Sequence, residues 1–133
     1  MALVICAFTG STRQDSNDIA YLNGPNFSKV EDYIEALQGN FSEEQIIVVP
    51  CAVRHALKEL GMSYVVVFPS LGLKKEYLER YKDKATRDFM DKNWEDLICE
   101  IQTEDYSNRV ILSKGKYIED IIEVVKRVGY DFK

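Results

Sequence analysis

The sequence predicts a three-layer α/β domain in which helices cover both faces of a doubly wound, mostly parallel sheet of about four strands. Four short runs of the chain, 2–8, 46–49, 64–68 and 110–112, are apolar without alternating polar positions. Continuous runs of this kind are typical of strands that are buried on both faces. Segments of helical periodicity separate most of these runs, and parallel strands require such crossover connections.

The length and composition predict a single domain that spans residues 1–133. Hydrophobic residues make up 46% and charged residues 29% of the 133 residues, which is typical of a folded globular protein. The longest apolar run is about a third of the ~20 residues that a membrane-spanning helix needs, and no basic leader precedes it. We therefore expect a cytoplasmic protein that does not bind membranes.

The first apolar run, Ala2–Phe8, is expected to be a central strand. A long irregular stretch follows it, Thr9–Phe27, which is rich in Ser, Thr, Asn, Asp and Gly. In parallel α/β folds, ligands bind beyond the carboxyl ends of the strands, and this stretch leaves the first strand at that edge. A functional site is therefore expected there.

Two helices are expected on either side of the second strand. The first starts at a capping box, Ser28–Glu31, and ends at Gly39, whereas the second ends at Gly61. Both carry apolar residues at the spacing i, i+3, i+4, i+7, which places them on one helix face. These residues are Val30, Tyr33, Ile34 and Leu37 in the first helix and Val53, Ala56, Leu57 and Leu60 in the second.

Three more helices are expected in the second half of the chain. One covers about Leu71–Lys84, and the next begins near Thr86, whose hydroxyl can cap it. The last is expected to end at Gly129. The predicted inner face of the second of these helices holds Phe89 or Met90, then Trp94, Leu97, Ile98 and Ile101, and that of the last holds Ile118, Ile121, Ile122 and Val125.

The charge is unevenly distributed along the chain. The segment Lys74–Lys92 has seven basic and five acidic residues, whereas the rest of the chain has ten basic and 17 acidic ones and the total is −5. Because neutralising nucleic-acid phosphates needs a basic face, direct nucleic-acid binding is not expected.

The three cysteines, Cys6, Cys51 and Cys99, lack the spacing of a metal site and lie in or beside apolar runs, so reduced core positions are expected. Cys51 precedes the only histidine, His55, by one helical turn, which leaves a Cys–His dyad as an alternative. Asp15 and Asp18 could hold a metal, but the residues around them also favour turns. We therefore predict no metal site.

The residues after the first strand differ from a kinase phosphate loop. That loop has the pattern G-x-x-x-x-G-K-[ST], in which backbone N–H groups surround phosphates and a lysine neutralises them. Phe8–Asp15 contains only Gly10, with no second glycine and no lysine, and no strong helical period follows. The residues Gly10, Ser11, Thr12 and Arg13 could still form a small anion-binding turn, and an ordinary exposed turn is the alternative.

A second basic group is expected at the junction of the two helices in the basic segment. Arg80, Lys82, Lys84 and Arg87 lie where a phosphoryl-transfer enzyme has a mobile lid. The alternative is a solvated helix pair. Glu76 can pair with Arg80, and Asp83 with Arg87, because each acid lies four residues before its base.

The segment Tyr64–Ile122 resembles small phage-encoded P-loop proteins of the adenylate kinase type. Ile46–Gly61 is similar in layout, and Asp15–Asp18 resembles the aspartate–serine run that follows the first helix in those proteins. The resemblance implies that the Walker A loop and the first helix are deleted here. The residues that carry it are Val66–Pro69, Leu73–Lys82, Phe89, Asn93–Trp94 and Ile111–Ile118.

The resemblance implies a P-loop kinase-like fold, with Arg80 and either Lys84 or Arg87 as phosphate contacts. Without the phosphate loop, the charge stabilisation that drives phosphoryl transfer is missing, so we assign no catalytic residue and no cofactor. The hypothesis is a non-catalytic, kinase-derived phage protein that binds a partner protein in the cytoplasm of a bacterial host. A concrete version is an anti-CRISPR inhibitor of an effector nuclease. The alternative is a nucleotide kinase or nucleotide-binding protein that uses ATP and magnesium at an unconventional phosphate site.

Overall fold

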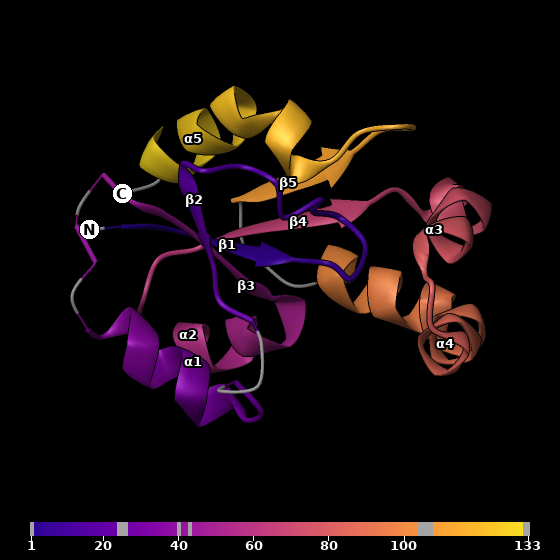
Figure 1. Ribbon diagram of the computed structural model, residues 1–133, viewed down its shortest axis with the longest axis horizontal. Coiled ribbons are helices and arrows are strands. Elements are labelled where there is room, and N and C mark those ends of the chain that lie inside the picture. The colour runs from indigo at the N-terminus through magenta and orange to yellow at the C-terminus, as the bar shows by residue number, and fades with distance from the viewer. Residues whose placement is uncertain (1, 24–26, 40, 43, 104–107, 132–133) are drawn as a thin grey trace.

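The computed structural model describes residues 2–23, 27–39, 41–42, 44–103 and 108–131, and it contains one parallel sheet (Figure 1). The strand order is β2-β3-β1-β4-β5, and every neighbouring pair is parallel. The predicted parallel α/β fold is therefore confirmed. The strands are β1 (Leu3–Ala7), β2 (Ile19–Tyr21), β3 (Ile46–Pro50), β4 (Val65–Pro69) and β5 (Arg109–Leu112).

The central strand is β1, as expected. It pairs with β3 from Leu3 opposite Ile46 onward, and with β4 from Ile5 opposite Val65 onward. β2 was not predicted, because three residues within a polar stretch are too short to give a periodic signal. It lies at the edge of the sheet beside β3, so the connection from β1 to β2 passes over β3.

The helices form layers on the two faces of the sheet. Figure 1 shows α5 on one side and α1, α2 and α4 toward the other, with α3 beside α4. The helices are α1 (Val30–Leu37), α2 (Arg54–Glu59), α3 (Lys74–Arg80), α4 (Lys84–Thr103) and α5 (Ile122–Asp131), and short 3₁₀ turns precede three of them at Cys51–Val53, Leu71–Leu73 and Ile118–Asp120.

The side chains of β1 supply both cores. Val4 and Cys6 pack with Trp94 and Ile98 of α4, whereas the alternate residue Ile5 packs with the group that includes Val125 of α5. All five residues of β1 are buried. This two-sided burial explains why the strand is apolar without alternation.

Three predicted helix boundaries are wrong by one to four residues. The carboxylate that caps α1 belongs to Asp32, because the backbone N–H groups of Ser28 and Lys29 each donate to it at 3.0 Å. α3 ends at Arg80. The cap of α4 is Asp83, which accepts from the backbone N–H and the hydroxyl of Thr86 at 2.9 Å.

Gly129 lies inside α5 and does not end it. A Cβ at this position would lie 2.2 Å from Cδ1 of Leu3 and 3.1 Å from Cγ2 of Val65. The glycine therefore allows α5 to approach the sheet closely, which a sequence pattern cannot distinguish from a helix stop.

The tertiary structure also decides the burial of the Phe89–Met90 pair and of the three cysteines. The sequence predicted that either Phe89 or Met90 begins the inner face of α4. Met90 is the buried one, whereas Phe89 is 57% exposed. Cys6 is buried and Cys51 is half-buried, but Cys99 is exposed, so its predicted core position is wrong. None of the three described cysteines is in a disulfide.

Candidate functional site

The loop after β1 runs from Phe8 to Asp18 without a helix, as expected from its sequence. Gly10 has φ of +92°, and a Cβ there would lie 2.9 Å from the ring of Tyr81. Ser11 is fully buried, and its hydroxyl lies 3.1 Å from the hydroxyl of Tyr77. These two residues anchor the loop to α3, and of the two only Ser11 is fully buried, since Gly10 lines a cavity at the carboxyl edge of the sheet.

The next three residues surround a carboxylate that belongs to the protein itself. Oε1 of Glu119 accepts from the backbone N–H of Arg13 at 3.0 Å. Oε2 accepts from the backbone N–H of Gln14 at 3.2 Å, the hydroxyl of Tyr21 at 2.6 Å and the hydroxyl of Thr12. The turn predicted to bind an anion is thus folded around the Glu119 side chain.

The hydrogen bonds keep Glu119 charged. Burial alone would raise the pKa of its carboxyl, but the bonds from Thr12, Tyr21 and the Arg13 N–H outweigh burial and lower the pKa below its ordinary value. Burial and the bond to this carboxylate raise the pKa of Tyr21 to about 12, so the phenol remains a donor at neutral pH.

The Arg13 side chain turns away from this carboxylate. Its guanidinium donates to both oxygens of Asp120 at 2.9 and 2.8 Å and to Asp15 at 3.0 Å. These hydrogen bonds raise the pKa of Arg13. The cation predicted to meet a phosphate is therefore paired with two acids of the same chain.

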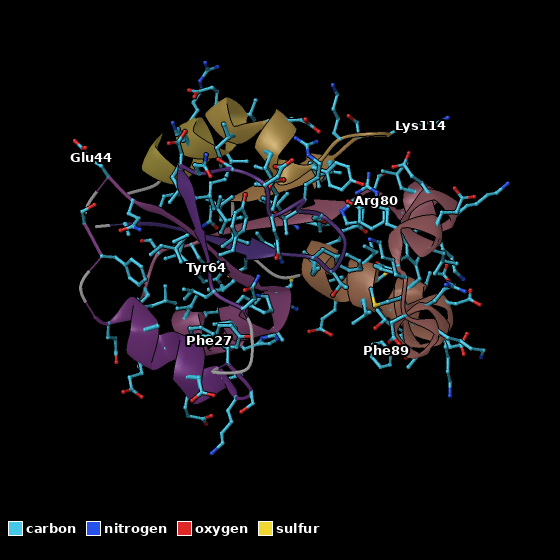
Figure 2. The ribbon with its side chains drawn as sticks, in the orientation of Figure 1. Phe27, Glu44, Tyr64, Arg80, Phe89 and Lys114 are labelled. Atoms are coloured by element: carbon cyan, nitrogen blue, oxygen red, sulfur yellow. The ribbon has the colours of Figure 1, made fainter. Side chains whose placement is uncertain are left out.

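Arg80 joins α3 to two loops at the carboxyl edge of the sheet (Figure 2). Its guanidinium lies between the rings of Tyr77 and Tyr117, 4.2 and 3.9 Å from their centroids. It donates to the carbonyl of Gly10 at 2.8 Å and to Glu76 at 3.1 Å. Such stacking and pairing make Arg80 a structural clamp.

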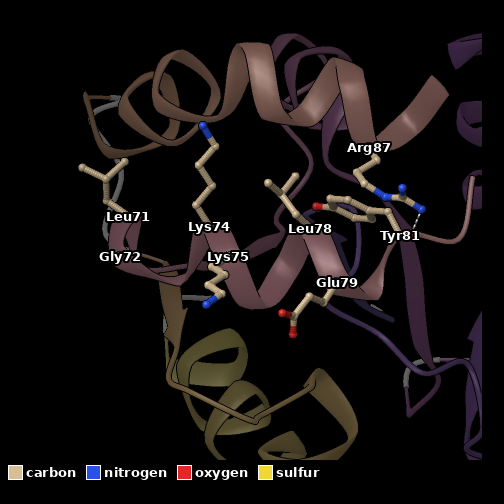
Figure 3. A pocket seen from close by; sticks show the side chains of 8 residues that line it. All are labelled: Leu71, Gly72, Lys74, Lys75, Leu78, Glu79, Tyr81 and Arg87. Atoms are coloured by element: carbon tan, nitrogen blue, oxygen red, sulfur yellow. Dashed lines mark hydrogen bonds between the residues drawn. The ribbon is translucent and has the colours of Figure 1, made fainter. Parts of the chain in front are cut away.

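The two remaining predicted contacts lie apart from this cluster. Lys84 is exposed and pairs with Asp88 at 2.6 Å. Arg87 donates to the carbonyl of Tyr81 at 3.2 Å and lines an open groove of about 810 Å³ between α3 and α4 (Figure 3). Lys74, Lys75 and Glu79 also line this groove. The structure thus brings Gly10–Arg13 and Arg80 together but places Lys84 and Arg87 elsewhere.

Two cavities open at the carboxyl ends of β1 and β3. The first, of about 230 Å³, is lined by Thr12, Gln14 and Tyr21, which also bind Glu119. The second, of about 330 Å³, lies between α2 and α4, and Phe89 forms part of its wall. Its other apolar lining residues are Phe8, Pro50, Ala52, Met90, Leu97 and Ile101.

The polar side of the second cavity contains Cys51 and His55, the residues of the alternative dyad. Arg54 is buried and donates to Sγ of Cys51 at 3.4 Å and to Glu100 at 2.8 Å. Nε2 of His55 lies 3.2 Å from the same Glu100 oxygen. The Cys51 thiol thus contacts Arg54, and the His55 imidazole contacts the Glu100 carboxylate.

Three residues of the site were not predicted from the sequence: Gln14, which adjoins the predicted turn, and Glu119 and Tyr21, which lie further from it. Glu119 lies 107 positions from Thr12 in a run with no motif, and Tyr21 was placed in an irregular stretch. No local signal identifies either one, because only the packing of the 3₁₀ turn after β5 against the loop after β1 brings them together.

Within the described part of the chain, no group of three or more His, Cys, Asp or Glu side chains is placed to hold a metal ion. None of the helices described there is long and apolar enough to cross a membrane. Comparisons with protein-family models, with curated proteins and with solved structures found no match for this chain.

Proposed function

We propose that this chain is a non-catalytic, kinase-derived protein of a phage or another mobile element, which binds a partner protein in the cytoplasm of a bacterial host. The concrete form of the proposal is an anti-CRISPR type inhibitor of an effector nuclease. The all-parallel sheet with helices on both faces supports a kinase-like origin.

The observation that carries the non-catalytic part is the Glu119 carboxylate in the loop after β1. A phosphoryl-transfer enzyme directs such N–H and hydroxyl donors, together with cations, at the phosphates of its substrate. Here Thr12, Gln14 and the backbone of Arg13 bind Glu119 instead. The guanidinium of Arg13 is also paired, with Asp15 and Asp120.

The outer face of α4 supports the protein-binding part. Phe89 is exposed beside the 330 Å³ cavity, and exposed aromatic residues are common anchors of protein interfaces (Figure 2). From residue 88 to 103 this helix has five acidic residues and one lysine. A partner with a basic surface, such as the nucleic-acid site of a nuclease, would complement this charge.

Calorimetric titration with ATP, with and without magnesium, tests the non-catalytic part. We expect no binding below millimolar concentration. Tight, magnesium-dependent binding that Arg13→Ala weakens would overturn this part and favour the alternative, a nucleotide-binding protein or kinase. One observation favours that alternative, the 230 Å³ cavity beside Thr12 at the edge where parallel sheets bind ligands.

A cleavage assay with CRISPR effector nucleases tests the inhibitor form. The purified chain should reduce cleavage of target DNA, and Phe89→Ala should weaken this inhibition about 10-fold or more, as expected for an aromatic anchor. Val124→Ala is the matched control, because Val124 is a 50% exposed hydrophobic residue of α5. If neither a panel of effectors nor their complexes with guide RNA bind the chain, the inhibitor form is wrong.

A further inference from the structure

Four hydrogen-bond donors converge on the Glu119 carboxylate, from Thr12, Arg13, Gln14 and Tyr21. We infer that these residues form an oxyanion-binding site that the chain fills with its own Glu119, and that the site binds a free carboxylate or phosphate once this side chain is removed. This inference goes beyond the proposed function, which requires only that the site be filled.

The composition of the site determines its ligand class. Two donors are backbone N–H groups and two are hydroxyls, and all four point at oxygen atoms of one carboxylate. The two N–H groups belong to the consecutive residues Arg13 and Gln14, and both donate to the one carboxylate. Backbone concavities of this kind bind anions. A neutral ligand with a single acceptor could not accept from all four donors at once.

The shape of the loop depends on contacts that do not involve Glu119. Tyr81 donates to the carbonyl of Thr9 at 2.8 Å, and Arg80 donates to that of Gly10. Ile118 donates its backbone N–H to the carbonyl of Ser11 at 2.9 Å. These contacts hold residues 9–11, which directly precede three of the four donors, so the start of the turn keeps its position before any anion binds. A partly pre-formed site reduces the entropic cost of binding an anion.

Glu119 excludes free anions because it is part of the same chain. An attached group has an effective local concentration that a dissolved anion must exceed to compete. Thr12, Gln14 and Tyr21 also line the 230 Å³ cavity, which gives solvent a route to the site. Removal of the side chain should consequently open a site that a small anion can reach.

The test uses Glu119→Ala, because this substitution removes a CH₂–COO⁻ group that acetate can replace. Thermal unfolding is measured in increasing acetate against chloride at equal ionic strength. We expect acetate, and separately inorganic phosphate, to raise the thermal unfolding midpoint of Glu119→Ala. The rise should be about 5 °C when the anion concentration is ten times its dissociation constant from the variant. The wild type and Glu123→Ala, which removes an exposed glutamate of the following helix, should show no difference between acetate and chloride.

Three further measurements locate the anion. Thr12→Val in the Glu119→Ala background should reduce the acetate effect, because one donor to the anion is lost. Glu119→Gln should show no acetate effect, since the amide still fills the site. If Glu119→Ala is unfolded in chloride, acetate should restore its far-UV circular dichroism. Equal acetate effects in the wild type and Glu119→Ala, or no effect in a folded or unfolded Glu119→Ala, would overturn the inference.

Discussion

At the scale of single residues, Glu119 links the two ends of the chain. Its carboxylate is bound by the loop after β1, and it lies on the 3₁₀ turn Ile118–Asp120 that leads into α5. The favourable hydrogen bonds require the ionised carboxylate. Stability should therefore depend on the protonation of this one side chain.

We predict that Glu119→Gln lowers the free energy of unfolding at pH 7 by about 1 to 3 kcal/mol, as expected for hydrogen bonds to a charged group. The pKa of Glu119 is lowered by folding, so its contribution is fully present above the unfolded value of 4.5 and is lost as the pH falls through the folded value. The free energies of unfolding of the wild type and Glu119→Gln, measured by urea unfolding from pH 7 to pH 3, should converge below about pH 4.5. A constant difference across this range would contradict the assignment.

A second residue-scale prediction concerns Gly129. Alanine usually stabilises a helix relative to glycine, but here its Cβ would meet Leu3 and Val65. We expect Gly129→Ala to destabilise the fold by about 1 to 3 kcal/mol through overpacking. Gly72→Ala is the control, because nothing lies within 4 Å of a Cβ there. Thermal unfolding measures both, and equal midpoints would show that α5 can shift without cost.

At the scale of elements, the position of α3 depends on Arg80. This helix has only seven residues, which is too short for stability in isolation. Arg80 stacks between Tyr77 and Tyr117 and donates to Gly10, so one side chain holds α3 against the loops after β1 and β5. For Arg80 the sequence left a phosphate-binding lid and a solvated helix pair open, and the structure shows this side chain in contact with both loops.

We predict that Arg80→Lys destabilises the fold by about 1 to 3 kcal/mol, because an ammonium group cannot stack on both rings and bind two acceptors in one plane. Hydrogen exchange should show faster amide exchange in α3 than in the wild type. Lys84→Ala is the control, since exposed i, i+4 pairs contribute little. Unchanged exchange in α3 would mean that the helix is held by its buried Tyr77 alone.

At the scale of the whole molecule, the acidic residues that exceed the basic ones include several on α4, the helix to which a partner is proposed to bind. The chain has a net charge of −5, and Asp96 lies on the exposed surface of α4, seven residues after Phe89 and so on the same side of the helix. A basic partner would be attracted to this side over a distance comparable to the Debye length.

We predict that Asp96→Lys weakens binding to the proposed partner nuclease and reduces the dependence of this binding on salt. The control is Glu31→Lys, which changes the net charge equally but on α1. Binding kinetics at 50 and 300 mM salt should show a lower association rate for Asp96→Lys only, because rim charges act mainly on association. An equal effect of both variants would indicate attraction by net charge and not by this face.

The sequence by itself determined the fold class, four of the five described strands and the central position of β1. These features follow from burial on both faces, which leaves continuous apolar runs in β1, β3 and β4. The absence of a phosphate-loop motif after β1 was also readable, since a motif is a local pattern. β2 was not predicted, because a short strand gives a weak local signal. The capping roles of Asp32 at the start of α1 and of Asp83 at the start of α4 were not predicted either, because neighbouring polar residues give competing signals.

Only the tertiary structure decided what the loop after β1 binds. Residues 10–13 were predicted as an anion-binding turn or an exposed turn, and neither choice included an anion from the same chain. Glu119 reaches the loop because the turn after β5 packs against it, with Ile118 donating to Ser11. A contact between residues more than 100 positions apart has no local signature. The physical reason is that hydrogen-bond donors constrain the charge of their ligand but not the position in the chain from which it comes.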